Sequence, residues 1–89
     1  MARPKQKQSP PLRGQALRDE TLNHLIGGER EVLRLLINRY PEALSLEEIQ
    51  RLSGYAPTTI NRHVLDLRNH GLITKTNEGA FHACEELFR

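Results

Sequence analysis

The chain has 89 residues, one cysteine and a formal net charge of +2. This length suits one small domain, and no apolar run approaches the roughly 18 residues that a membrane helix needs. The first residues lack the apolar stretch of a secretory signal, and the lone Cys84 fits a reducing compartment. We therefore expect a soluble, cytoplasmic, single-domain protein.

Residues 1–14, MARPKQKQSPPLRG, carry four basic side chains and no acidic one, a charge of +4. They contain too little apolar surface to build a core, so we predict a disordered basic tail. Such a tail either stays a flexible terminus or reaches a phosphate backbone. In the second case the contacts would come from Arg3, Lys5 and Lys7.

Residues 15–28 form the next predicted segment. Leu22, Leu25 and Ile26 stand at helical spacing, which predicts an appended helix over 15–26 that the pair Gly27–Gly28 ends. A second apolar stripe, beginning at Leu33, predicts a longer helix that ends before Pro41.

The clearest local pattern begins near Ser45. Ser45 and Glu48 have the spacing of a capping box, in which each side chain binds a free backbone amide of the other residue. Ile49 and Leu52 supply the predicted buried stripe of this helix. Gly54 suits the left-handed corner that ends it.

The helix after the corner is predicted to begin at Pro57, whose missing N–H costs nothing in a first helical turn. Ile60, Val64 and Leu67 lie at i, i+4 and i+7, so they are expected to face inward. Gly71 is predicted to end the helix. Two β-prone runs then flank a glycine-containing turn, which predicts a hairpin with strands near 72–76 and 80–84. Residues 85–89 are left as a C-terminal tail.

Two short helices joined by a tight turn make a helix-turn-helix unit. Such a unit places its second helix in the major groove of DNA, where polar side chains near the helix start read base edges. By chemistry, Arg62 suits guanine and Asn61 suits adenine. Thr58 and Thr59 suit a phosphate or a thymine methyl group.

Residues 29–84 resemble the winged helix-turn-helix DNA-binding domain of bacterial and archaeal transcriptional regulators. The resemblance rests on SLEEIQRLSGYAPTTINRHVLDLRNHGLI followed by a hairpin. It implies a mainly α (α+β) fold: a three-helix core, a C-terminal β-hairpin wing and an extra N-terminal helix. Ala56 stands where the family usually has a Ser or Thr cap. By position, the implied recognition surface and wing contact are Thr58, Thr59, Asn61, Arg62, His63 and Lys75.

Several residues keep two interpretations. His63 is either packed between helices or a base or phosphate contact. Leu65 either fills the core from an edge or is exposed and marks a protein contact. Neutralisation of phosphates would depend on Arg62, Arg68, Lys75 and the tail.

The histidines and the cysteine do not have the spacing of a four-ligand metal site, and no nucleophile–base set or phosphate loop is evident. We expect no cofactor, no metal and no enzymatic activity. The predicted function is sequence-specific binding of double-stranded DNA by a small transcriptional regulator that acts as a homodimer, with residues 15–28 as a possible dimerisation element. Two alternatives stay open: a winged-helix protein-interaction module using the Leu65 face, and a DNA-binding module of replication, partition or mobile-element machinery.

Overall fold

The computed structural model describes residues 13–89, so Arg3, Lys5 and Lys7 of the predicted tail lie outside the described residues. The fold is mainly helical with a small antiparallel hairpin, which confirms the predicted winged helix-turn-helix architecture. In chain order the elements are α1 (Gly14–Asn23), α2 (Gly27–Arg39), α3 (Leu46–Ser53), α4 (Pro57–Asn69), β1 (Ile73–Lys75), β2 (Phe81–Ala83) and the 3-10 helix η1 (Glu85–Phe88).

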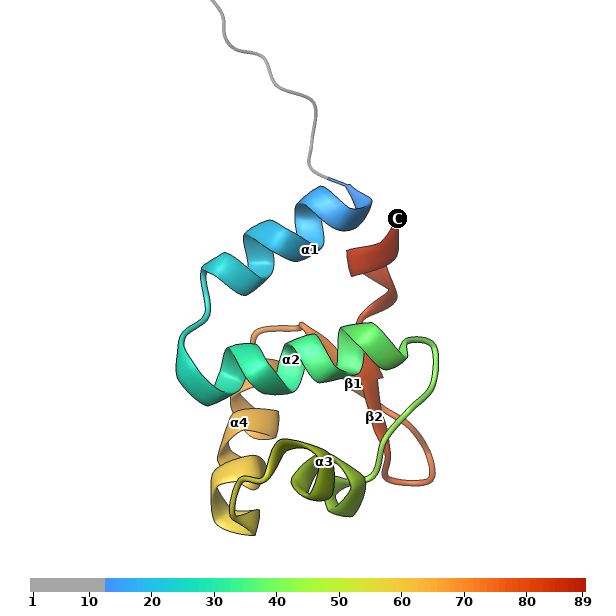
Figure 1. Ribbon diagram of the computed structural model, residues 1–89. Coiled ribbons are helices and arrows are strands. Elements are labelled where there is room, and N and C mark those ends of the chain that lie inside the picture. Colours follow the sequence, from blue (N-terminus) through green and yellow to red (C-terminus); the bar gives the residue numbers. More distant parts are fainter. Residues whose placement is uncertain (1–12) are drawn as a thin grey trace, which may run out of the picture.

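Helix α2 runs through the middle of the molecule (Figure 1). It contacts α1 on one side and α3 and α4 on the other, and it also packs against β2. Its inward side chains Val32, Leu33 and Leu36 are completely buried. This central position means that α2 holds the helix-turn-helix unit, the wing and the appended helix on one shared core.

The glycine pair Gly27–Gly28 begins α2, so the prediction that it ends the preceding helix was wrong. Gly27 has a φ of +58°, which glycine adopts without steric cost. The Arg30 guanidinium donates from Nε to the carbonyl oxygen of Leu22 at 3.1 Å and from Nη2 to that of Leu25 at 2.7 Å. These contacts cap the end of α1 from the next helix, which local helical spacing does not reveal.

The C-terminal residues, predicted as a tail, fold into η1 and pack on α1. Arg18 of α1 donates to the carbonyl oxygen of Leu87 at 3.1 Å, and its guanidinium lies 4.7 Å from the Phe88 ring centroid. On its other side Phe88 stacks on Tyr40, with 3.9 Å between ring centroids. Both ends of the described chain therefore close over α2.

Helix α3 confirms the predicted capping box. The amide of Glu48 donates to Ser45 Oγ at 3.2 Å, and the amide of Ser45 donates to Glu48 Oε1 at 3.0 Å. Gly54 ends the helix with a φ of +81°, as predicted. Ile49 is buried, but Leu52 is 41% exposed, so its predicted burial was wrong. Two turns of helix cover only a narrow strip of core, and Leu52 lies at its edge.

Helix α4 follows the corner and begins at Pro57, as predicted. Ile60, Val64 and Leu67 are buried, which confirms the inward face. The helix packs on both α2 and α3, so its inward side is held along its length. Gly71 follows with a φ of +73° and turns the chain into the hairpin.

The hairpin confirms the predicted wing in a shorter form. Strand β1 pairs antiparallel with β2 in the register Ile73↔Ala83, Thr74↔His82 and Lys75↔Phe81. Leu44, just before α3, forms a β-bridge with Phe81 on the other side of β2, through two N–H···O bonds of 2.8 Å. The wing is thus tied to the start of the helix-turn-helix unit.

Candidate nucleic-acid interface

Helix α4 presents a polar face away from the core. At about 100° per residue, Thr58, Arg62 and Leu65 lie within about 60° of one another, opposite the buried Leu67. Thr58, Asn61, Arg62 and Leu65 are exposed. Thr58, Asn61 and Arg62, which are predicted to contact DNA, therefore lie side by side on the exposed face of α4. The opposite face of the helix packs on the core.

The first half of α4 also forms a shallow hollow. It measures about 340 Å³ and is lined by Thr58, Thr59, Arg62 and His63. Two hydroxyls, a guanidinium and an imidazole thus share one concave surface, and these groups suit hydrogen bonding to phosphate or base edges.

The N-terminus of α4 is open. Ala56 at the N-cap supplies no side-chain hydrogen bond, and Pro57 has no N–H to donate. The amides of the first helical turn carry the positive end of the helix dipole and need partners from outside the helix. Beside the hydroxyls of Thr58 and Thr59, these donors are suited to a DNA phosphate.

His63 lies between helices, as its packing interpretation predicts. Its ring meets Tyr55 edge-to-face, with 5.8 Å between ring centroids. On the other side it packs against Gly28 so closely that an added Cβ at Gly28 would lie 2.7 Å from His63 Cδ2. Within residues 13–89, Nδ1 is buried without a hydrogen-bond partner. Sequence reasoning predicted this packing but did not identify Gly28 as the residue that the ring contacts.

A carboxyl pair lies where the start of α2 meets α4. Burial raises the pKa of Glu29 above 4.5, and hydrogen bonding and repulsion from Asp66 raise it further; His63 and His70 oppose the shift. A carboxyl with a raised pKa in the folded state stabilises the fold fully below the unfolded pKa and loses that contribution as pH rises through the folded pKa. The contribution of Glu29 to the free energy of unfolding therefore declines as the pH rises above 4.5.

Replacing Asp66 with Asn should lower the pKa of Glu29 toward 4.5, because repulsion from the neighbouring carboxylate is removed. The pKa can be followed by NMR titration of the Glu29 side-chain carboxyl carbon. Glu48→Gln, on α3, serves as the control and should leave the Glu29 titration unchanged. An unchanged Glu29 pKa in Asp66→Asn would show that burial alone causes the shift.

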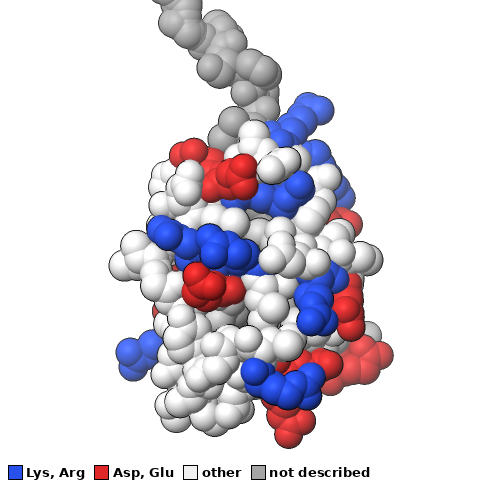
Figure 2. Space-filling view, viewed as in Figure 1, with Lys and Arg blue, Asp and Glu red and all other residues white. Residues whose placement is uncertain are grey.

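The remaining predicted contacts lie at the margins of this face. Arg68 is exposed in the last turn of α4, and Lys75 is exposed at the end of β1. On the face shown in Figure 2, basic and acidic side chains alternate, and the area over α4 is largely uncharged. A surface without a continuous positive charge is suited to contacts with base edges as well as with phosphates.

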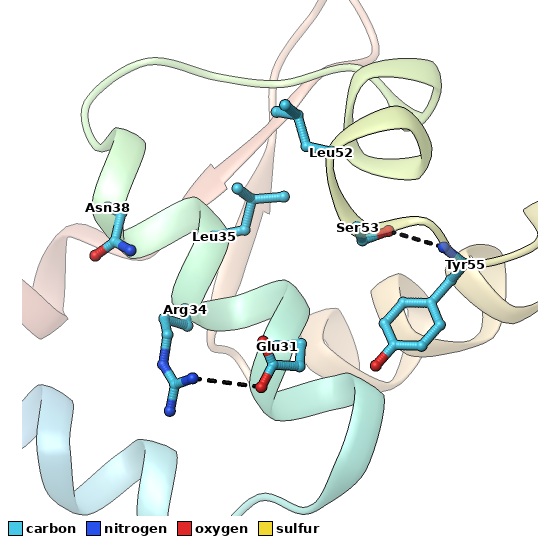
Figure 3. A pocket seen from close by; sticks show the side chains of 7 residues that line it. All are labelled: Glu31, Arg34, Leu35, Asn38, Leu52, Ser53 and Tyr55. Atoms are coloured by element: carbon cyan, nitrogen blue, oxygen red, sulfur yellow. Dashed lines mark hydrogen bonds and ion pairs between the residues drawn. The ribbon is translucent and has the colours of Figure 1, made fainter.

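A second hollow, of about 440 Å³, opens between α2 and α3 (Figure 3). Leu35 and Leu52 face it from the two helices. Two polar contacts lie at this hollow: Arg34 pairs with Glu31 at 3.3 Å, and the Tyr55 amide donates to Ser53 Oγ at 3.3 Å. The exposed side chain of Leu52 lines this hollow, which involves none of the predicted DNA contacts.

These elements define a winged helix-turn-helix DNA-binding domain: a three-helix core, an anchored second helix with a polar outer face, and a hairpin wing. Comparison with protein families finds that residues 31–77 match the IclR helix-turn-helix domain. This match covers just over half of the 89 residues. The chain belongs to this family, whose domain binds DNA in bacterial transcriptional regulators.

Searches of curated proteins and of solved structures gave no match. Among residues 13–89, no helix has the length and apolar character needed to cross a membrane.

Proposed function

We propose that this protein is a transcriptional regulator that binds specific sites on double-stranded DNA as a homodimer. In this proposal α4 enters the major groove, Arg62 and Asn61 read bases, and the first turn of α4 holds a phosphate. Arg68 and Lys75 contact the flanking backbone. Arg3, Lys5 and Lys7 of the tail add further phosphate contacts. The protein acts in the cytoplasm without a catalytic step, by occupying its site.

The observation that carries the proposal is the division of α4 into two faces. Ile60, Val64 and Leu67 anchor one face in the core, while Asn61 and Arg62 are exposed on the other. A helix held in this way offers its outer side chains to the groove with little loss of conformational freedom on binding. The family match supports DNA binding by this domain.

Two points support a homodimer: one recognition helix contacts only a few base pairs, and the apolar side chain of Ile26 is exposed. Two copies related by a two-fold axis would read two half-sites about one helical turn apart. Most of the apolar residues of 15–28 and 85–89 pack on the chain's own core, whereas Ile26 is 81% exposed at the turn between α1 and α2. Ile26 is therefore the side chain we place in the dimer contact.

The test begins with selection of preferred duplexes from a random library by the full chain. Binding is then measured by fluorescence anisotropy over a salt series, and the stoichiometry by analytical ultracentrifugation. We expect a two-fold symmetric sequence, two chains per duplex, and weaker dimerisation in Ile26→Ser. Deletion of residues 1–12 should reduce the salt slope by about 0.9 for each phosphate that the tail neutralises. Absence of any preferred sequence would reject base readout and favour a protein-interaction module.

A further inference from the structure

Leu65 is an apolar side chain at the centre of the polar face of α4. It is 56% exposed. Of the large apolar side chains that are exposed in residues 13–89, it alone belongs to α4; Ile26 precedes α2 and Leu52 lies on α3. Its position excludes the role of a core residue at an edge, which was one of its two interpretations.

The helical geometry puts Leu65 in line with the base-reading residues. At about 100° per residue, Leu65 is rotated only about 20° from Thr58 and about 160° from the buried Leu67. It follows Asn61 by one turn, or about 6 Å along the axis, which corresponds to roughly two base-pair steps of 3.4 Å. A helix that brings Asn61 to a base edge therefore brings Leu65 to the groove floor nearby.

The chemistry of the groove offers one apolar partner at this depth. Thymine is the only base of unmodified DNA that exposes a methyl group in the major groove. A water-exposed leucine gains nothing from facing a hydrogen-bonding edge, but it removes both itself and a methyl group from water when the two meet.

We propose that Leu65 is a specificity-determining residue that contacts the 5-methyl group of a thymine in each half-site. This inference rests on the proposed function, because it requires α4 to read bases in the major groove. It adds an apolar contact to the hydrogen bonds that Asn61 and Arg62 would make. The methyl group distinguishes thymine from the other bases, at a position close to the base that Asn61 reads.

The test replaces each thymine of the selected duplex in turn by deoxyuridine, which lacks only the methyl group. Each duplex is titrated with the full wild-type chain, with Leu65→Ala and with the matched control Leu52→Ala. At one thymine per half-site, wild type and Leu52→Ala should lose about fourfold in affinity, the value expected for one buried methyl group. Leu65→Ala should bind the thymine and deoxyuridine duplexes equally. Circular dichroism confirms that all three proteins are folded.

The possible results distinguish failure of the methyl contact from failure of the proposed function. If selection yields no preferred sequence, the proposed function fails and this contact fails with it. If selection yields a preferred sequence without thymine, or if Leu65→Ala discriminates thymine from deoxyuridine as wild type does, the methyl contact is wrong while sequence-specific binding stands. The assignment to Leu65 would also be wrong if Leu52→Ala lost the preference for thymine over deoxyuridine to the same extent as Leu65→Ala.

Discussion

Replacing Arg62 with Ala should lower the affinity for the preferred duplex by about 10- to 100-fold and leave the affinity for a scrambled duplex almost unchanged. The size follows from the roughly 1–3 kcal/mol that a good contact to a base contributes to discrimination. Arg62 is exposed beside Asn61 on the outer face of α4, so truncation should not disturb the core. Fluorescence anisotropy with both duplexes at a fixed salt concentration measures the ratio.

The matched control is Arg89→Ala, which removes the same charge from the C-terminal end of the chain, away from α4 (Figure 1). Arg89 forms an ion pair with Glu85 at 2.7 Å, and both side chains are mostly exposed, so its loss should have little effect on stability. This variant should keep the preference for the selected duplex. If Arg62→Ala instead weakens binding to both duplexes by the same factor, Arg62 contacts a phosphate and another residue reads the base.

Replacing Gly28 with Ala should destabilise the protein by about 1–3 kcal/mol, the usual cost of forcing an extra group into a packed site. Gly28 lies within α2 and has an ordinary helical backbone. The cost therefore comes from the His63 ring, which occupies the space that the new methyl group needs. Urea denaturation followed by circular dichroism measures the free energy of unfolding.

Gly28→Ala should stabilise the protein, and no longer destabilise it, when His63 is first replaced by Ala. With the ring gone, the added methyl group at residue 28 fills the vacated space, and alanine is favoured over glycine in a helix by about 0.5–1 kcal/mol. Gly71→Ala is the control, because its φ of +73° makes alanine strained, and among the described residues no atom beyond the chain neighbours lies within 4 Å of the added Cβ. It should destabilise both backgrounds alike. A Gly28→Ala cost that persists without His63 would show that the backbone, and not the ring, requires glycine.

The contact between His63 and Gly28 also bears on the proposed DNA binding. It belongs to α4 and directly follows Arg62, yet its ring is seated against α2 through Gly28. Together with the buried face of α4, this contact fixes the rotation of the helix about its own axis. The same rotation sets where Arg62 and Leu65 point. Sub-ångström displacement of such a seat is enough to weaken a positioned contact.

The sequence by itself determined the elements whose causes are local. The capping box of Ser45 and Glu48 and the glycine corner at Gly54 depend on neighbouring residues alone, and both are present as predicted. The inward stripe of α4 and its start at Pro57 follow equally from spacing and backbone chemistry. The same periodicity predicts the outer face of α4 and the base-reading residues on it, because side chains outside the buried apolar stripe are exposed.

Tertiary structure decided the features whose partners are distant in sequence. Helix α1 ends where Arg30 donates to the carbonyl oxygen of Leu22. The C-terminal residues form η1 with Phe88 held between Arg18 and Tyr40. The exposure of Leu52 depends on how much of α3 the core can cover. Gly28 was visible in the sequence only as a helix breaker. Its use became evident once folding brought it against His63, because a close approach between two helices depends on both surfaces at once and not on either segment alone.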